Sequence, residues 1–384
     1  MLTATLALVT LIGIEKIATF VVMLSILVVL HELGHFVVAR RCGVRVNEFA
    51  VGMGPKVVGW TSPRSGTLYS LRVLPIGGFC LMEGEDNKHS EAEQQRDFRA
   101  HATEGRPEPS GNANFQAKSP LQRLAIVAAG PISNFVLCYV ILLAGAVAFG
   151  VQSDNVQPLV GDVVAGMPAA QAGIRPGDRI VQLDGTPVSS GKALVDAIHA
   201  SLGKRLHVVY ERDGQQTAID VTAKACPPPH KDMGCIGFTP FPQYQHVGFG
   251  TAVADSGVQF LNIADETVGM VALLATHFAK YADQVSGPIG MAQMSATVQD
   301  WGWGPYFSFA ALISFALGLF NLLPVPALDG GRAAFIVAEL IRGRPVDPEK
   351  EAMVHVAGFA VLMAVVLLVA FHDIVRIATG NGVL

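Results

Sequence analysis

Charged side chains are scarce in this chain of 384 residues. Asp, Glu, Lys and Arg make up 15% of it, whereas 51% of the residues are hydrophobic. So little charge argues against a large soluble protein and favours several membrane-spanning segments. The chain also lacks a basic segment interleaved with aromatic residues, so nothing indicates a nucleic-acid partner, and the net charge of -4 identifies no other.

Cysteine is scarce too, and the five cysteines are too few for a disulfide scaffold. Cys42, Cys80 and Cys138 fall in segments that we expect to be cytoplasmic or in the membrane. Cys226 and Cys235 bracket a short proline-rich segment in the part expected to face outward. That pair could be oxidised there, and two free thiols in a loop are an equally good interpretation.

Long apolar runs take the place of charge. A helix needs about 20 apolar residues to cross a bilayer core of about 30 Å. Four runs approach that length: residues 17–39, 124–150, 305–324 and 354–371. The apolar stretch at residues 1–14 has neither a basic start nor a small-residue cleavage site, so we interpret it as retained chain and not as a signal peptide.

Basic residues near these runs predict the orientation of the chain. Arg and Lys gather after the first run, before the second, and between the third and fourth. Because cytoplasmic loops are enriched in these residues, we expect those three connections to be cytoplasmic. Both termini and residues 151–304 would then face outward.

Two stretches between the first and second runs are rich in β-branched and aromatic residues and in glycine. They are NEFAVGMGPKVVGW (47–60) and TLYSLRVLPIGGF (67–79), and they predict short strands or hairpins. Both are unusually apolar for a cytoplasmic loop. Residues 83–119 are instead polar and mixed in charge, which predicts a flexible connection.

The outward segment contains the signals of a small, mostly β module. Strand-like and turn-like sequence over residues 158–188 is followed by helical spacing over 192–203 and by two strand-like runs joined across Asp213-Gly214. This order and the phrase AGIRPGDRIVQLDG resemble one PDZ domain, a module that binds peptides at a sheet edge. The Gly and Asp residues of the phrase are also ordinary turn residues. Residues 250–280 then predict an amphipathic helix that lies against the membrane or the spans.

Three ionisable side chains, His31, Glu32 and His35, interrupt the first apolar run within the stretch VVLHELGHFVVAR (28–40). Residues four apart share one helix face, so His31 and His35 can hold one metal ion with Glu32 beside it. A five-residue H-E-x-x-H match also arises by chance, and histidines in a helix core can be satisfied by neighbouring groups. Inside a span, however, ionisable residues usually mark a functional interior.

A catalytic zinc ion typically takes three protein ligands, so a third must come from elsewhere. FNLLPVPALDGGR (320–332) closes the third run, and Asp329 is its one acidic residue. Pro324 and Pro326 cannot continue a helix, and broken backbone at membrane depth is tolerated where it lines a cavity or is buried in protein. Asp329 can therefore turn toward the histidines; the alternative is a turn or N-cap residue at the membrane edge. Asn134, like Pro131, is expected to shape the second span.

These motifs stand in an order that chance would not produce: HELGHFVVARRCGVRV, LPIGGF, KSPLQRLAIVAAGPISNF, the PDZ-like module, SGPIGMAQ and FNLLPVPALDGGR. The chain resembles the bacterial site-2 protease family, intramembrane zinc metalloproteases of the RseP type. The resemblance implies one Zn²⁺ per chain held by His31, His35 and Asp329. It also implies that Glu32 is catalytic and that Asn321, in N-x-x-P-x-P-x-L-D-G, helps to hold substrate. From the sequence alone, a polar contact between packed helices is an equally good interpretation of Asn321. The best-known members carry two tandem PDZ modules, whereas this sequence shows one.

The resemblance further implies the substrates and the location. Substrates would be single-pass membrane proteins already trimmed by another protease, such as anti-sigma factors, or remnant signal peptides. The protein would reside in the bacterial inner membrane, with its active site toward the cytoplasm. Its PDZ-like domain would be periplasmic, where it could exclude untrimmed substrates or dock new C-termini.

The apolar strands near the first span could pair with an unwound substrate as an added strand. The residues concerned are Leu71, Val73, Gly77, Gly78 and Phe79. Alternatively, the hairpin only packs against the spans.

The predicted fold class is a multi-pass α-helical membrane protein with about four transmembrane helices, a membrane-associated β-hairpin region and one inserted mostly-β PDZ-like domain. The expected segments are 1–40 (first transmembrane helix with H-E-x-x-H), 41–120 (β-hairpin region and polar linker), 121–150 (second helix), 151–245 (PDZ-like), 246–304 (amphipathic helical), 305–340 (third helix with the aspartate motif) and 341–384 (loop and fourth helix).

Two other functions are compatible with such a chain. A membrane scaffold would use a structural metal site, which is usually closed by four protein ligands. A metal transporter would carry ionisable residues along a path through several spans, whereas here they gather at one depth.

Overall fold

The computed structural model describes residues 13–84, 113–152, 158–164, 166–226, 232–241, 244–281 and 286–378. Residues 1–12 of the N-terminal apolar stretch and residues 85–112 of the predicted polar connection lie outside the described residues. The chain divides into two compact units. The first contains Met1–Leu142, Gln259–Ala292 and Phe309–Ile374, and the second contains Leu143–Val258, Gln293–Ser308 and Val375–Leu384.

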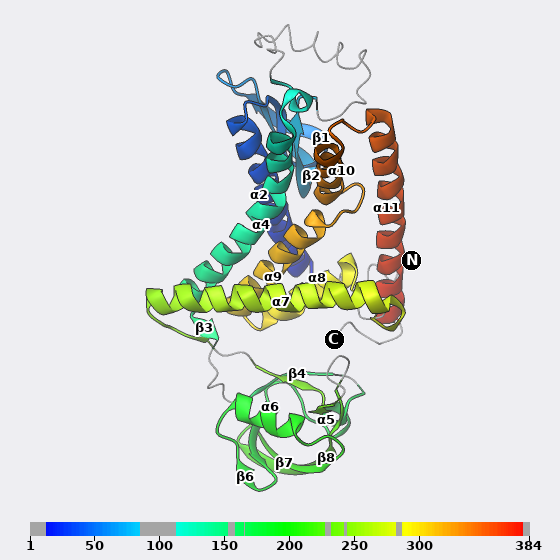
Figure 1. Cartoon of the computed structure of the whole chain (residues 1–384). Helices are drawn as coiled ribbons and strands as arrows, with labels where there is room; N and C mark the ends of the chain where they lie inside the picture. The colour runs from blue at the N-terminus through cyan, green and yellow to red at the C-terminus, as the bar shows by residue number, and fades with distance from the viewer. Residues whose placement is uncertain are drawn as a thin grey trace. The chain divides into compact units, whose positions relative to one another are not determined.

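Five helices in the described part of the chain are long and apolar enough to cross a membrane (Figure 1). They are α2 (Ile14–Arg41), α4 (Pro120–Phe149), α7 (Phe249–Tyr281), α9 (Trp303–Leu322) and α11 (Pro348–Ala378). The four helices other than α7 contain all or nearly all of the predicted apolar runs, which are thus confirmed as helices, although runs 124–150 and 305–324 extend past Phe149 and Leu322. Helix α7 is the one predicted to be amphipathic, and the number of spans stays a prediction.

Helices α2 and α4 approach each other closely because small residues stand where they cross. A Cβ atom on Gly34 would collide with the carbonyl oxygen of Ala129 and lie 2.8 Å from Cβ of Ser133. The Ser133 hydroxyl lies 3.1 Å from the Leu30 carbonyl oxygen, to which it donates across the same contact. Small residues allow such close packing of apolar helices. The crossing point is therefore at the level of the histidines.

Strands β1 (Val46–Thr61) and β2 (Leu68–Met82) form the predicted antiparallel hairpin. Its register is irregular, because residues 46–51 of β1 pair with residues 78–82 on one side, and residues 48–51 also pair with residues 68–71 on the other. Residues 58–61 pair with the outer side of residues 68–71. Within the described residues, 68–71 thus have registered partners on both sides, and Gly78 and Phe79 have them on one.

The two halves of the hairpin differ in burial. The half with Val46, Phe49, Cys80 and Met82 is buried against α2, α4 and α10 (Asp329–Arg342). The other half exposes large apolar side chains, namely Met53, Val57, Val58, Trp60, Leu71, Val73, Leu74 and Ile76. A contiguous apolar patch of this kind marks a surface for lipid or for another apolar partner.

The mostly β module follows the predicted order of elements. Its elements are β4 (Val160–Val163), α5 (Pro168–Gln171), β5 (Arg179–Leu183), β6 (Thr186–Pro187), α6 (Gly191–His199), β7 (Arg205–Arg212) and β8 (Gln215–Thr222). The sheet order is β6-β5-β7-β8, and β11 (Phe238–Pro240) pairs with β4. Asp213 and Gly214, with φ of 51° and 77°, make the predicted tight turn between β7 and β8.

The remaining described elements are short, apart from α8 (Pro288–Asp300). They are η2 (Phe115–Ala117), β3 (Val151–Gln152), β9 (Lys224–Ala225), β10 (Gly234–Cys235) and β12 (Tyr244–Gln245). Cys226 and Cys235 form a disulfide beside the β9–β10 pair. The sequence left open whether this cysteine pair is oxidised or reduced, and in the structure it is oxidised.

The disulfide should stabilise the module that contains it. It joins cysteines 9 residues apart, and the chain-entropy model predicts a stabilisation of about 2.5–3 kcal/mol for so short a loop. Replacing both Cys226 and Cys235 by serine should lower the free energy of opening of β7 and β8 by that amount, as measured by hydrogen exchange. Cys42→Ser, at a free cysteine outside the module, should leave it unchanged.

Candidate metal centre

Helix α2 buries His31 and His35 on one face. Both are 6% exposed, although they lie in an apolar helix. Their spacing of four residues brings the two side chains together, with the ring centroids 4.9 Å apart and the ring planes nearly perpendicular. The predicted shared face is therefore present, and both imidazoles are removed from solvent.

Asp329 meets these histidines from a break between two helices. Helix α9 ends at Leu322 and α10 begins at Asp329. Glycine at positions 330 and 331 lets the first turn of α10 pack on the preceding loop. A Cβ atom on Gly330 would collide with the Leu322 and Leu323 carbonyl oxygens, and one on Gly331 would lie 2.5 Å from the Val325 carbonyl oxygen. The break thus points the Asp329 carboxylate toward α2.

The three side chains converge on one point. Oδ2 of Asp329 lies 3.0 Å from Nε2 of His31 and 3.3 Å from Nε2 of His35. The two Nε2 atoms are 3.2 Å apart. Zinc bonds of about 2.0–2.2 Å place tetrahedral ligand atoms roughly 3.3–3.5 Å apart, close to this triangle. Hydrogen bonds alone suit it less well, because two N–H donors aimed at one carboxylate oxygen would also face each other.

The far side of each imidazole contacts a polar group of α4. Nδ1 of His35 lies 2.8 Å from the Ile126 carbonyl oxygen, to which it donates. Nδ1 of His31 lies 3.1 Å from the side-chain amide of Asn134, which is fully buried. The carbonyl partner selects the His35 tautomer whose Nε2 is free to ligate, and the Asn134 amide nitrogen fixes the orientation of the His31 ring. The residues present therefore fit a divalent ion.

Two residues of α4, Gly130 and Asn134, lie in the site although the sequence did not predict a role for them in it. Gly130 leaves space for the ligands, because its Cβ would collide with Nε2 of His35 and lie 2.7 Å from Nε2 of His31. Asn134 follows four residues later on the same helix face. The one signal in the sequence was polarity at membrane depth, which did not reveal which side chain Asn134 would contact.

A cavity of about 220 Å³ opens beside the three converging side chains. Its lining residues are Val28, His31, Glu32, Asn134, Leu317, Asn321, Ala327, Leu328 and Asp329. Glu32 and Asn321, both predicted from the sequence, thus face the same space as His31 and Asp329. Because one water occupies about 30 Å³, the cavity can hold several waters or a segment of peptide.

The predicted strand residues lie near this cavity without lining it. Leu71, Val73, Gly77, Gly78 and Phe79 all belong to β2. Strand β2 packs on α2 just before the histidines: the Ser25 hydroxyl contacts the Pro75 carbonyl oxygen, and the Cβ position of Gly78 is 3.5 Å from Cγ2 of Val29. Leu71 belongs to the segment that is paired on both sides.

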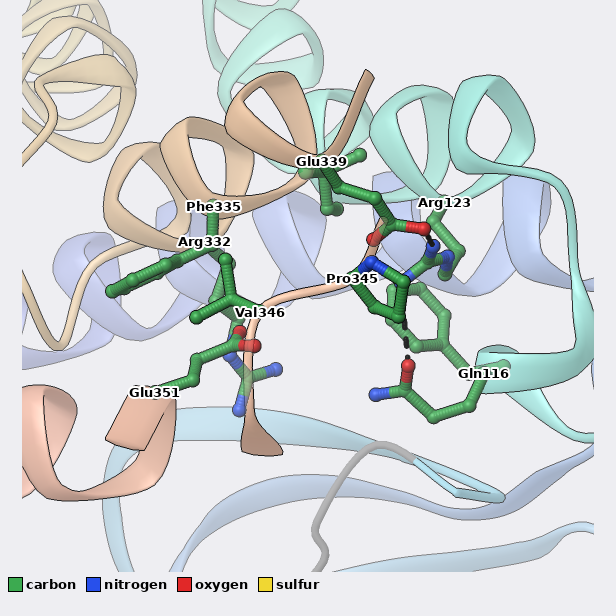
Figure 2. A pocket seen from close by; sticks show the side chains of 10 residues that line it. Gln116, Arg123, Arg332, Phe335, Glu339, Pro345, Val346 and Glu351 are labelled. Atoms are coloured by element: carbon green, nitrogen blue, oxygen red, sulfur yellow. Dashed lines mark hydrogen bonds and ion pairs between the residues drawn. The ribbon is translucent and has the colours of Figure 1, made fainter. Parts of the chain in front are cut away.

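Helix α10 is also held at the end remote from Asp329. The Arg123 guanidinium on α4 donates to the Glu339 carboxylate at 2.5 Å and to the Gln116 side chain at 3.3 Å (Figure 2). These groups line a second pocket of about 70 Å³. Glu339 follows Asp329 by ten positions, which is about 15 Å along the helix. The ion pair therefore fixes the far end of the helix that carries the carboxylate.

An H-E-x-x-H helix facing a carboxylate among long apolar helices defines a membrane metallopeptidase. Residues 19–365 match the profile of Peptidase family M50, and the chain belongs to this family. The predicted resemblance is thereby confirmed. "Regulator of sigma-W protease RasP" from Bacillus subtilis is 31% identical over 95% of this chain and 99% of its own length. "Zinc metalloprotease RasP" from Bacillus licheniformis is 31% identical over 94% and 99%.

Other relatives include a protein from Rhizobium meliloti, 34% identical over 93% of this chain and 96% of its own. Among solved structures, the PDZ domain of the SdrC-like protein from Listeria monocytogenes shares 26% identity. The similarity covers 23% of this chain and 90% of the Listeria chain, with a TM-score of 0.20.

Gly130→Ala tests the space at the centre. The added Cβ would occupy the position toward which the two Nε2 atoms point, so we expect loss of bound metal and at least a hundredfold loss of peptidase activity. Metal content per purified chain is the direct measurement. Gly269→Ala on α7 is the matched control, because its Cβ would meet nothing within 4 Å. Full metal content in Gly130→Ala would contradict the assignment.

Proposed function

We propose that this peptidase hydrolyses peptide bonds inside transmembrane segments with one Zn²⁺ held by His31, His35 and Asp329. The observation that carries the proposal is the triangle of ligand atoms 3.0 to 3.3 Å apart. The names of the relatives, zinc metalloprotease among them, support the choice of metal. Within the described residues no fourth His, Cys, Asp or Glu joins the group, which leaves a coordination position open.

Glu32 is proposed as the general base and acid. When bound, zinc supplies Lewis acidity for a water molecule and for the scissile carbonyl. Glu32 lines the cavity next to His31, where it can take a proton from the attacking water and return it to the leaving amine. Such proton transfer is typically worth about 10²–10⁴ in rate.

Asn321 is proposed to hold the substrate. It lines the same cavity from the end of α9, and its amide is an uncharged donor and acceptor. It can bind the substrate backbone or donate to the oxygen of the scissile carbonyl as negative charge develops there. A donor in the second role is worth about 10²–10³ in turnover.

A transmembrane substrate must unwind before its carbonyl can be attacked, and its freed backbone groups then need partners. We assign this role to β2. Among the described residues, Gly78 and Phe79 have registered partners in β1 on one side, which leaves the other edge available at these two residues. The double pairing at Leu71 argues that added-strand binding is at this later part of β2. Val73 and Gly77 precede this edge in β2, so we expect their backbone conformation to set its position.

The substrates proposed are single-pass membrane proteins trimmed beforehand by another protease, such as anti-sigma factors, or remnant signal peptides. One relative is named for the regulation of sigma-W, which supports the first class. The proposed location is the bacterial inner membrane, with the active site toward the cytoplasm. The PDZ-like module would be periplasmic, where it docks new C-termini or excludes untrimmed chains.

Glu32→Gln separates a peptidase from a structural metal site. Purified protein in detergent should cleave a model transmembrane substrate and stop when a zinc chelator is added. Glu32→Gln should lose about 10²–10⁴ of turnover while keeping its zinc, because it removes the proton acceptor and leaves the ligands. Glu15→Gln, exposed at the start of the same helix, is the control and should cleave normally. Undiminished cleavage by Glu32→Gln would exclude this residue as the base.

Val73→Pro tests the strand contact. Proline removes a backbone donor and bends β2 before its open edge, so cleavage should fall about five- to tenfold with zinc content unchanged. Val57→Pro is a comparable change, since both residues are exposed valines without a registered partner strand residue. Equal cleavage by Val73→Pro and the wild type, or an equal loss in both variants, would remove the proposed strand contact.

A further inference from the structure

The loop before Asp329 has one backbone donor that its own backbone does not satisfy. Pro324 and Pro326 have no N–H group, and Leu323, Val325 and Leu328 donate to loop or helix-end carbonyl oxygens. The exception is Ala327. Its N–H donates to Nδ1 of His355 on α11 at 2.9 Å. Since backbone donors at such sites must be paired, His355 completes the hydrogen bonding of the loop.

Ala327 is also where the loop backbone is unfavourable. Its φ of +77° lies in the left-handed region, where a Cβ atom is strained. Ala327 stands two residues before Asp329 and lines the cavity together with His31 and Glu32. A strained residue in such a position persists when other contacts fix it.

The contact with α11 is specific. Because Nδ1 accepts, the ring proton of neutral His355 is on Nε2, which is buried without a hydrogen-bond partner among the described residues. Phe335 of α10 packs at the ring, with centroids 5.6 Å apart. One turn further along α11, a Cβ atom on Gly358 would collide with Cβ of Pro326 and lie 3.0 Å from its carbonyl oxygen. Gly358 thus lets α11 approach closely enough for His355 to reach the loop.

We propose that His355 is a positioning residue for the metal centre: its imidazole holds Ala327 in the left-handed conformation that aims the Asp329 carboxylate at His31 and His35. This inference rests on the proposed function, in which Asp329 is a zinc ligand. It gives a non-ligand histidine on α11 a role in metal affinity and in turnover.

The test compares zinc affinity and turnover in purified full-length variants. Affinity is measured with Zn²⁺ alone in competition with a chromophoric chelator. His355→Leu removes the acceptor and should weaken zinc binding and lower kcat, each about tenfold, with KM little changed. His355→Asn can place an oxygen where Nδ1 lies, so both values should stay within about threefold of the wild type. His372→Leu, exposed on the same helix, is the matched control and should match the wild type.

A second-site change distinguishes positioning from packing. Glycine adopts positive φ without the Cβ penalty, so Ala327→Gly should restore most of the zinc affinity and kcat lost in His355→Leu. Wild-type affinity in His355→Leu, or no recovery in the double variant, would overturn the proposal. Asp329→Asn separates this outcome from failure of the site itself. If Asp329→Asn also keeps wild-type affinity for zinc, the proposed zinc site is wrong. If Asp329→Asn loses affinity while His355→Leu keeps it, the zinc site stands and only the role proposed for His355 is wrong.

Discussion

Burial of two imidazoles and a carboxylate among apolar helices is the constraint on which this structure depends. Each group alone would cost several kcal/mol in that environment, so the three must share a partner. Their neighbours follow from this. Gly130 leaves room between the nitrogens, and the Ile126 carbonyl oxygen and Asn134 hold the far sides of the rings. Helix α10 brings the carboxylate and is tied to α4 at its other end.

Glycine and proline determine how closely the elements around this centre approach. Gly34 allows α2 and α4 to cross at the level of the histidines, and Gly358 allows α11 to reach the loop that carries Pro326. Pro324 and Pro326 end α9 early enough for Asp329 to start a new helix instead of continuing the old one. An uninterrupted helix would have carried residue 329 about 10 Å beyond Leu322 along its axis.

Local sequence patterns predicted much of this arrangement, but they could not predict contacts between residues that are far apart in the chain. Helical spacing placed His31 and His35 on one face, and the Asp213-Gly214 turn was visible as a dipeptide. In contrast, Asn134 and His355 act through single contacts with residues 103 and 28 positions away, which no spacing rule encodes. The double pairing of residues 48–51 depends on how β2 folds back, and the Cys226–Cys235 bond depends on the pairing of β9 with β10.

Helix α11 combines exposure with control of the ligand loop. In the most apolar 18-residue stretch of α11 none of the residues is buried, whereas 44% of the residues in the corresponding stretch of α9 are buried. Its polar contacts are near its two ends: His355 accepts from Ala327, and buried Asp373 accepts from the backbone of Gly287 and Gly290 at the start of α8. The SGPIG segment thus anchors the end of α11 remote from His355. The contacts of His355 and Asp373 therefore help to fix where α11 lies, and the contact of His355 with Ala327 links α11 to the loop before Asp329.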